Sequence, residues 1–182
     1  MASARLFPNR AEQAPPLRDV QGKISRGKGV KQGGLFEENT GPAARPRALV
    51  ANIDGGSRGN PGPAASGWVI ADADGEILVE KGLCIGRETN NRAEYMALLF
   101  ALEDALLLKA DRLTVRSDSE LLVRQMKGQY RVKNEGLKGL FERAKEMSRS
   151  FKSFTIQHVP REANKLAYAA VNRALDAEAK CR

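Results

Sequence analysis

The chain has 182 residues, of which 42% are hydrophobic, and it carries a formal net charge of +8 with a pI near 9.7. It has no apolar run long enough for a transmembrane helix and no apolar segment typical of a secretory signal. Its two cysteines, Cys84 and Cys181, fit neither a disulfide framework nor a metal-knuckle spacing. We therefore expect a cytoplasmic protein, monomeric by default. The basic excess favours a polyanionic partner such as nucleic acid.

Residues 1–47 differ in composition from the rest of the chain. They hold nine Lys and Arg against four Asp and Glu, and five of the eight prolines. Such a segment buries too little apolar surface to offset its ordering entropy, so we predict a disordered basic extension. It would either contact phosphates without sequence preference or serve only as a solubilising extension. Within "QGGLF", Gln32, Leu35 and Phe36 resemble the short peptide by which bacterial replication proteins dock on the sliding clamp, which implies a weak contact of that kind.

Regular patterns begin at residue 48. The apolar run "ALVANIDGG" ends in Asp54 and two glycines, which predicts a strand entering a tight turn. "SGWVIADADGEILVEKGLCIG" predicts two strands joined by a hairpin at "DADG". "TNNRAEYMALLFALEDALLLKA" predicts a long helix that Thr89, Asn90 or Asn91 can cap.

Strands and helices alternate in the second half. "RLTVRSD" and "FTIQHV" predict strands, and "SELLVRQMKG", "LKGLFERAKEMSRSF" and "REANKLAYAAVNRALDAEAK" predict helices. Strands joined by hairpins pair antiparallel, whereas strands separated by helices are parallel. The sequence therefore predicts an α/β fold over residues 48–178, with a mixed five-stranded sheet flanked by helices. In that sheet three antiparallel strands precede the parallel ones, and residues 179–182 form a tail.

Three acids occupy special positions in this order. Asp54 ends the first strand, Glu94 lies early in the long helix, and Asp118 ends the fourth strand. Strand ends and helix starts can converge on one edge of such a sheet, where carboxylates repel one another unless a cation neutralises them. Their oxygens suit Mg²⁺ or Mn²⁺ and would permit two-metal hydrolysis of a phosphodiester. The alternative, that each acid is a turn, cap or helix-start residue, is left open by the spacing alone.

Four segments resemble one family in the same order and spacing. They are "IDGGSRGNPGPAASGWVI", "TNNRAEYMALLFAL", "VRSDSELLVRQMKGQYRVKN" and "HVPREANKLA". The chain resembles the cellular type-1 ribonuclease H family over residues 48–177, in its compact form, because "MKGQYRVKNEGLKGL" leaves no room for a basic handle. The resemblance implies a ribonuclease H-like fold and cleavage of the RNA strand of RNA–DNA hybrids with two Mg²⁺ or Mn²⁺ ions. It also implies that Asp54, Glu94 and Asp118 are catalytic metal ligands.

The same resemblance implies substrate contacts. Asn60 matches a residue that contacts RNA 2′-hydroxyls, and Asn90 matches another substrate contact. Arg87, Thr89 and Asn134 match residues that hold a phosphate of the DNA strand. Turn and cap chemistry is the alternative for Asn60 and Asn90, and the two roles can coexist.

The last helix departs from the family pattern N-x-x-A-D-x-L-A-N. This chain has "NKLAYAAVN" from Asn164, with Tyr168 in place of the fourth carboxylate. A neutral phenol is a poor Mg²⁺ ligand. Asn172, one helical turn further on, is a possible substitute, although it has its own counterpart in the family pattern.

Three alternatives follow from this departure. They are a hybrid-cleaving nuclease with a weakened second-metal site, an impaired module that binds hybrids or double-stranded RNA, and a different nuclease on the same fold. We favour the first, because a protein released from catalysis need not keep three acids that repel one another.

Overall fold

The structure is a computed structural model that describes residues 47–180. The clamp-like peptide at residues 32–36, the rest of the predicted extension up to residue 46, and residues 181–182 lie outside the described residues. The backbone N–H of Arg47 donates to Asp111 Oδ2 at 2.8 Å, and its guanidinium donates to the Leu108 carbonyl at 2.7 Å. These bonds fix the start of the described chain.

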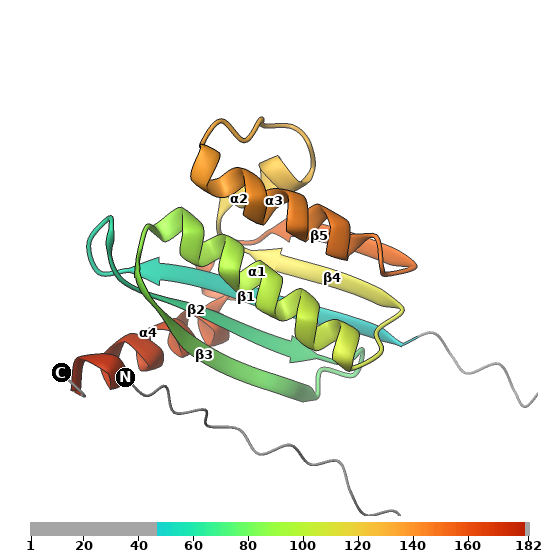
Figure 1. Ribbon diagram of the computed structural model, residues 1–182. Coiled ribbons are helices and arrows are strands. Elements are labelled where there is room, and N and C mark those ends of the chain that lie inside the picture. The colour runs from blue at the N-terminus through green and yellow to red at the C-terminus, as the bar shows by residue number, and fades with distance from the viewer. Residues whose placement is uncertain (1–46, 181–182) are drawn as a thin grey trace, which may run out of the picture. The chain divides into compact units, whose positions relative to one another are not determined.

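Five strands form one mixed sheet in the order β3-β2-β1-β4-β5 (Figure 1). The strands are β1 (Ala48–Ser57), β2 (Gly62–Ala71), β3 (Ile77–Glu88), β4 (Arg112–Ser117) and β5 (Ser153–His158). The first three pair antiparallel, β4 is parallel to β1, and β5 is parallel to β4. The predicted α/β fold with a mixed five-stranded sheet is therefore confirmed.

β1 continues to Ser57 and does not end at Asp54 as predicted, and its register places Asp54 beside the end of β4. Ile53 lies opposite Ser117, the last residue of β4, and Ser117 lies opposite His158, the last residue of β5. Asp54 is thus the first residue of β1 beyond the parallel pairing, and Asp118 is the first residue beyond β4. Because carboxyl ends of parallel strands share one edge of a sheet, both acids emerge at the same place.

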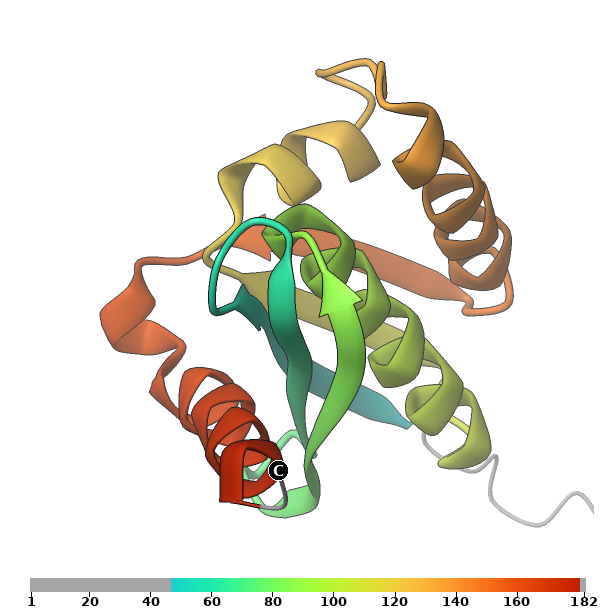
Figure 2. The same ribbon diagram turned by 60° about the vertical axis from the view of Figure 1, so that its left-hand side comes forward.

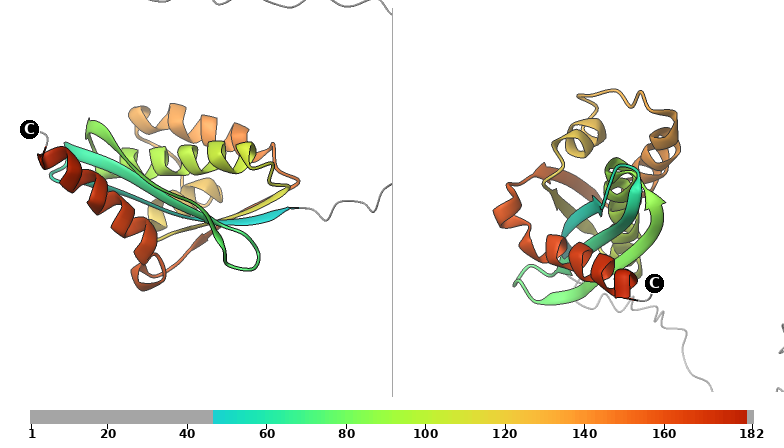
Figure 3. Two further views of the ribbon diagram at one scale, coloured as in Figure 1. Left: turned by 90° about the horizontal axis from the view of Figure 1, so that it is seen from below. Right: turned by 90° about the vertical axis from the view of Figure 1, so that its left-hand side faces the viewer.

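Four α-helices cover the two faces of the sheet (Figures 2 and 3). They are α1 (Asn90–Leu107), α2 (Glu120–Met126), α3 (Glu135–Ser148) and α4 (Lys165–Lys180), with a short 3₁₀-helix, η1 (Arg161–Ala163), before α4. α1 packs on β1 and β2 and carries α3 at its side, whereas α4 crosses the first three strands on the other face. α4 continues to Lys180 and so includes the first two residues of the predicted tail. Among residues 47–180, no helix is long and apolar enough to cross a membrane.

Two glycines allow these helices to lie close to the sheet. A Cβ on Gly55 would collide with the backbone of α1 at Ala93 and Glu94, and a Cβ on Gly67 would lie 2.6 Å from the Ala167 carbonyl of α4. Side chains alternate across a strand, and Asp54 lies opposite Gly67. The Asp54 side chain is therefore on the face that α4 covers, while Glu94 comes from the helix on the other face.

The main core lies between α1 and the sheet. Its largest fully buried side chains are Leu49, Ile53, Ile70, Tyr95, Leu98, Leu102, Leu113 and Leu122. α1 is apolar around much of its circumference because the sheet covers one side and α3 another. A smaller cluster of Ala65 from β2 with Val171 and Leu175 from α4 lies between α4 and the sheet. Packing on both faces thus fixes α1 and α4, which carry the residues described next.

Candidate active site

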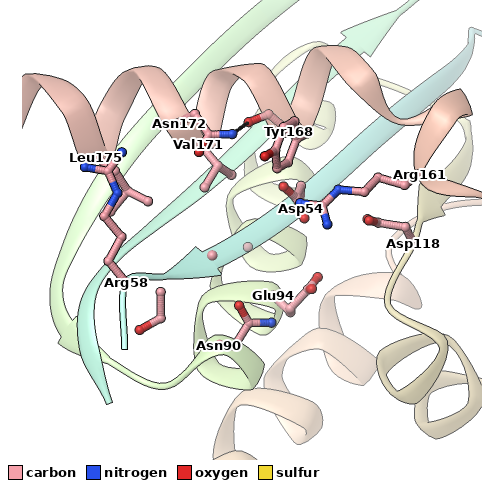
Figure 4. A pocket seen from close by; sticks show the side chains of 13 residues that line it. Asp54, Arg58, Asn90, Glu94, Asp118, Arg161, Tyr168, Val171, Asn172 and Leu175 are labelled. Atoms are coloured by element: carbon pink, nitrogen blue, oxygen red, sulfur yellow. Dashed lines mark hydrogen bonds between the residues drawn. The ribbon is translucent and has the colours of Figure 1, made fainter. Parts of the chain in front are cut away.

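Three carboxylates from three elements face one pocket. Asp54 comes from β1, Glu94 from α1, and Asp118 from the segment between β4 and α2, and all three line the same cavity (Figure 4). Asp54 and Glu94 are each only 6% exposed. The structure therefore brings together the three acids that the sequence places at strand ends and a helix start.

Capping residues fix the directions of the two helices beside the pocket. Thr89 caps α1, with its hydroxyl oxygen accepting from the Arg92 N–H at 3.4 Å. Ser119 caps α2 in the same way, accepting from the Leu122 N–H at 3.4 Å. Because Ser119 follows Asp118 directly, the start of α2 also fixes the backbone of that acid. Of the three cap candidates for α1, the structure selects Thr89.

The buried acids are strongly perturbed. Burial, followed by the charge of Asp118, raises the pKa of Asp54 to about 7. Burial, followed by the charges of Asp54 and Asp118, raises the pKa of Glu94 well above its ordinary value. Arg161 acts in the opposite direction on both pKa values. The protein therefore only partly compensates the negative charge of this pocket.

The donor set of the pocket fits a hard divalent cation. Glu94 Oε2 is buried and has no hydrogen-bond partner among the described residues, which is costly unless something else satisfies it. In residues 47–180, no group of three or more His, Cys, Asp and Glu side chains is arranged so that it could hold a metal ion. Mg²⁺ ordinarily takes only one or two carboxylates and completes its shell with waters and substrate phosphates. An open pocket of carboxylates suits that mode of binding.

Asn164 orients one of the acids. Its side chain is buried, and its Nδ2 donates to Asp118 Oδ1 and to the Ile53 carbonyl, both at 2.8 Å. Its Oδ1 accepts from Asn52 Nδ2 at 3.2 Å. One amide thus connects β1, the start of α4 and the end of β4. This role of Asn164 was not predicted, although the residue begins the motif that contains Tyr168.

Tyr168 occupies the wall of the pocket in the first turn of α4. Its side chain is 39% exposed, and the guanidinium of Arg161 lies over its ring at 4.1 Å from the centroid. Asn172 lines the same pocket, and its Nδ2 donates to the Tyr168 carbonyl at 3.0 Å. The Asn172 amide nitrogen is thus bound to its own helix. Sequence reasoning missed Arg161, whose only signal was its place in "HVPREANKLA".

The expected substrate contacts divide between two neighbouring pockets. Asn90 lines the acidic pocket, and its backbone N–H donates to Asn60 Oδ1 at 3.2 Å. A second pocket is lined by Asn60, Thr89, Asn91, Arg92, Asn134 and Leu137. The bond between Asn90 and Asn60 therefore links the two pockets at the first turn of α1.

Arg87 lies outside both pockets, and an arginine that was not predicted, Arg92, lines the second one. Arg87 is an exposed residue of β3 opposite Pro63, and it lines neither of the two pockets within the described chain. Arg92 lines the second pocket instead, and donates to the Gly136 carbonyl at 2.7 Å. This position of Arg92 was not predicted, although the residue follows the Thr89 cap of α1 by about one turn.

Known proteins resemble the chain over most of its length. A family model described as Reverse transcriptase-like matches residues 52–174. Ribonuclease HI of Halobacterium salinarum is 42% identical over 162 residues, which are 88% of this chain and 81% of that protein. The Mycobacterium tuberculosis protein named Bifunctional protein Rv2228c is 43% identical over 133 residues, which are 72% of this chain but only 36% of that protein.

Solved structures agree with these similarities. The N-terminal RNase H domain of Rv2228c is 42% identical, with a TM-score of 0.72 over 74% of this chain and 98% of that chain. LC11-RNase H1 in complex with RNA/DNA hybrid is 43% identical, with a TM-score of 0.68 over 71% of this chain and 98% of that chain. The matched residues 52–174 include the three acids and Tyr168. The chain therefore belongs to the cellular type-1 ribonuclease H family.

Proposed function

We propose that the protein hydrolyses the RNA strand of RNA–DNA hybrids with the help of divalent cations. The observation that carries this proposal is the convergence of Asp54, Glu94 and Asp118 on one pocket, where their charge is only partly compensated. The relative LC11-RNase H1, whose structure was solved with an RNA/DNA hybrid, supports the choice of substrate.

The three acids would hold Mg²⁺ or Mn²⁺, and Asn164 keeps Asp118 directed into the pocket. Bound ions of this kind activate water and stabilise the oxygen that leaves. Two ions are the expected number in this family. Tyr168 offers no carboxylate, so we propose that the second of them is held weakly.

The residues around the acids would select and position the substrate. Asn60 and Asn90 are bonded to each other at the border of the acidic pocket, where amides can pair with the 2′-hydroxyls that distinguish RNA from DNA. Thr89 and Asn134 in the second pocket offer a hydroxyl and an amide to a phosphate of the DNA strand. Arg87, exposed on β3, would act further along that strand.

A second candidate function is a binding module that no longer cleaves. It is favoured by the neutral ring of Tyr168 at the wall of the acidic pocket and by the positive charge of Arg161 next to the acids. In that case the protein would bind the hybrid through the same two pockets and leave both strands intact.

The experiment that separates these functions uses a hybrid labelled on its RNA strand. We expect the full chain to cleave that strand in Mg²⁺ or Mn²⁺ and to leave a DNA duplex of the same sequence intact. Asp118→Asn is the control for contaminating nucleases. Retained hybrid binding without cleavage in either ion would establish the binding module instead.

A further inference from the structure

The pairing of Arg161 with Tyr168 occurs at the position where this chain lacks the fourth carboxylate of its family. The guanidinium of Arg161 lies 4.1 Å from the Tyr168 ring centroid, a distance at which the ring face attracts a cation. Arg161 belongs to η1 and Tyr168 to the first turn of α4. Between them, Asn164 is anchored to β1 by its bond to the Ile53 carbonyl, so both partners are attached to the same fixed segment.

The positive charge of Arg161 acts on the acids, although Arg161 forms no ion pair with them. Its guanidinium lies beside Asp54 and Asp118 in the pocket (Figure 4), and its charge lowers the pKa values of Asp54 and Glu94 against the effect of burial. Among the described residues, however, its side chain forms no salt bridge and no hydrogen bond. The other arginine in this pocket, Arg58, is paired with Asp176.

A cation–π contact leaves the charge and the N–H donors of an arginine available to a ligand. The guanidinium presents a planar set of N–H groups that matches two oxygens of a phosphate. A carboxylate at position 168 would neutralise Arg161, whereas the Tyr168 ring holds it and leaves its N–H groups unengaged. A phosphate group of the substrate is therefore the ligand that this arrangement suits.

We propose that Arg161, held in place by the Tyr168 ring, binds a substrate phosphate at the acidic pocket and supplies the positive charge that a second divalent ion would otherwise bring. Tyr168 is the positioning residue, because it acts through Arg161. This inference rests on the proposed cleavage of hybrids. One divalent ion and one guanidinium together carry as much positive charge as three carboxylates can carry negative charge, so the pocket needs only one tightly bound ion.

The first test counts ions. Mn²⁺ is titrated into the full-length protein and followed by electron paramagnetic resonance, without substrate and without reference to activity. We expect one tightly bound Mn²⁺ per chain in the native protein and two in Tyr168→Asp, where a fourth carboxylate is restored. Two equally tight ions in the native protein would overturn the proposal.

The second test measures hybrid binding in EDTA, where no divalent ion contributes and nothing is cleaved. Fluorescence anisotropy of a labelled hybrid should show affinity at least about tenfold weaker for Arg161→Gln, with the slope of log K against log salt reduced by about one. The matched control is Arg149→Gln, which removes the same charge from an exposed arginine at the end of α3, before β5 begins. The proposal is wrong if both variants lose the same affinity.

The third test isolates the ring. Tyr168→Leu keeps an apolar side chain but loses the attraction for a cation, and should weaken binding in EDTA about threefold to fivefold. Tyr168→Phe keeps the ring face and should restore affinity to within about twofold. Equal affinity of Tyr168→Leu and the native protein would overturn the role of the ring. If Tyr168→Leu binds as well as the native protein and the native protein cleaves the hybrid, only this inference fails. If the native protein neither binds nor cleaves hybrids, the proposed function fails as well.

Discussion

Two neighbouring pockets at the start of α1 differ in how their polar groups are satisfied. The acidic pocket holds Asp54 and Glu94 with raised pKa values, and Glu94 Oε2 lacks a partner within the described chain. The second pocket combines neutral amides and a hydroxyl with Arg92, which is paired with Glu88 at 2.7 Å. The acidic pocket therefore carries negative charge that is only partly compensated, whereas the charge of Arg92 is paired, although its Nε makes no hydrogen bond among the described residues.

This difference assigns different tasks to two sites connected by one hydrogen bond, from the Asn90 N–H to Asn60 Oδ1. Titratable side chains with strongly shifted pKa values are concentrated at catalytic and ligand-binding sites. Neutral amides at a surface bind a substrate equally in its ground and transition states. Substitutions in the first pocket should thus change kcat, and those in the second pocket should change KM.

The largest effect is expected from Asp118→Asn. The amide keeps the shape of the side chain but removes one charge from the set that would hold the cations, so kcat should fall at least about 10³-fold. The measurement is steady-state cleavage of a labelled hybrid in Mg²⁺. A variant that retains more than a tenth of native kcat would show that the acidic pocket is not the catalytic site.

The next effect is on stability. In the folded, metal-free protein the Asp54 carboxyl has a pKa of about 7, against an ordinary 3.8, because of burial and the charge of Asp118. Between these two values the folded chain binds more protons than the unfolded chain, so the free energy of unfolding should decrease as pH rises from about 4 to about 7. Burial raises the pKa of Glu94 in the same direction. The decrease from Asp54 should be on the order of 3 kcal/mol.

Urea unfolding in EDTA at pH 5 and pH 8 measures this decrease. Asp54→Asn should flatten the pH dependence, because the amide does not titrate. Mn²⁺ should stabilise the native protein more at pH 8 than at pH 5, since the cation competes with protons for the same oxygens. Equal stability of the native protein at both pH values in EDTA would contradict the raised pKa values.

The fold and the position of the acids follow from local patterns. Alternating apolar residues, the "DADG" turn and the 3.6-residue period of α1 each predict an element from neighbouring residues. β1 continues past Asp54 to Ser57 and does not end there as predicted, but Asp54 and Asp118 still meet, because they follow the last parallel pair of β1 and β4. This is why the elements and the convergence of the acids could be predicted.

The remaining features depend on side-chain directions that no local pattern sets. Asn164 bonds to Ile53 across 111 positions, and Arg161 stacks on Tyr168 between two different helices. Arg87, which resembles a residue that holds a phosphate of the DNA strand, is exposed on β3, whereas Arg92 lines the pocket of Asn134. Tertiary packing and strand register decide these contacts.

A third, smaller effect is expected from Asn164→Ala. The substitution removes one hydrogen-bond donor from Asp118 and one from the Ile53 carbonyl. We therefore expect kcat to fall about 10–100-fold, as for residues that orient metal ligands. Gln157→Ala is the matched control, because it removes an exposed amide of β5 that lines neither of the two pockets. Circular dichroism checks folding. If the two variants lose the same fraction of kcat, Asn164 does not act through Asp118.

The smallest effect is expected in the second pocket, from Asn134→Ala. Asn134 precedes α3, but its side chain makes no capping hydrogen bond, so its removal should leave the helix intact. A lost hydrogen bond to a substrate phosphate contributes about 1 kcal/mol, which corresponds to a KM raised about fivefold. Because such a contact is the same in the ground and transition states, kcat should stay within about twofold of native. An unchanged KM with a lower kcat would remove the distinction between the two pockets, and would place Asn134 with the residues that act on the reacting phosphate.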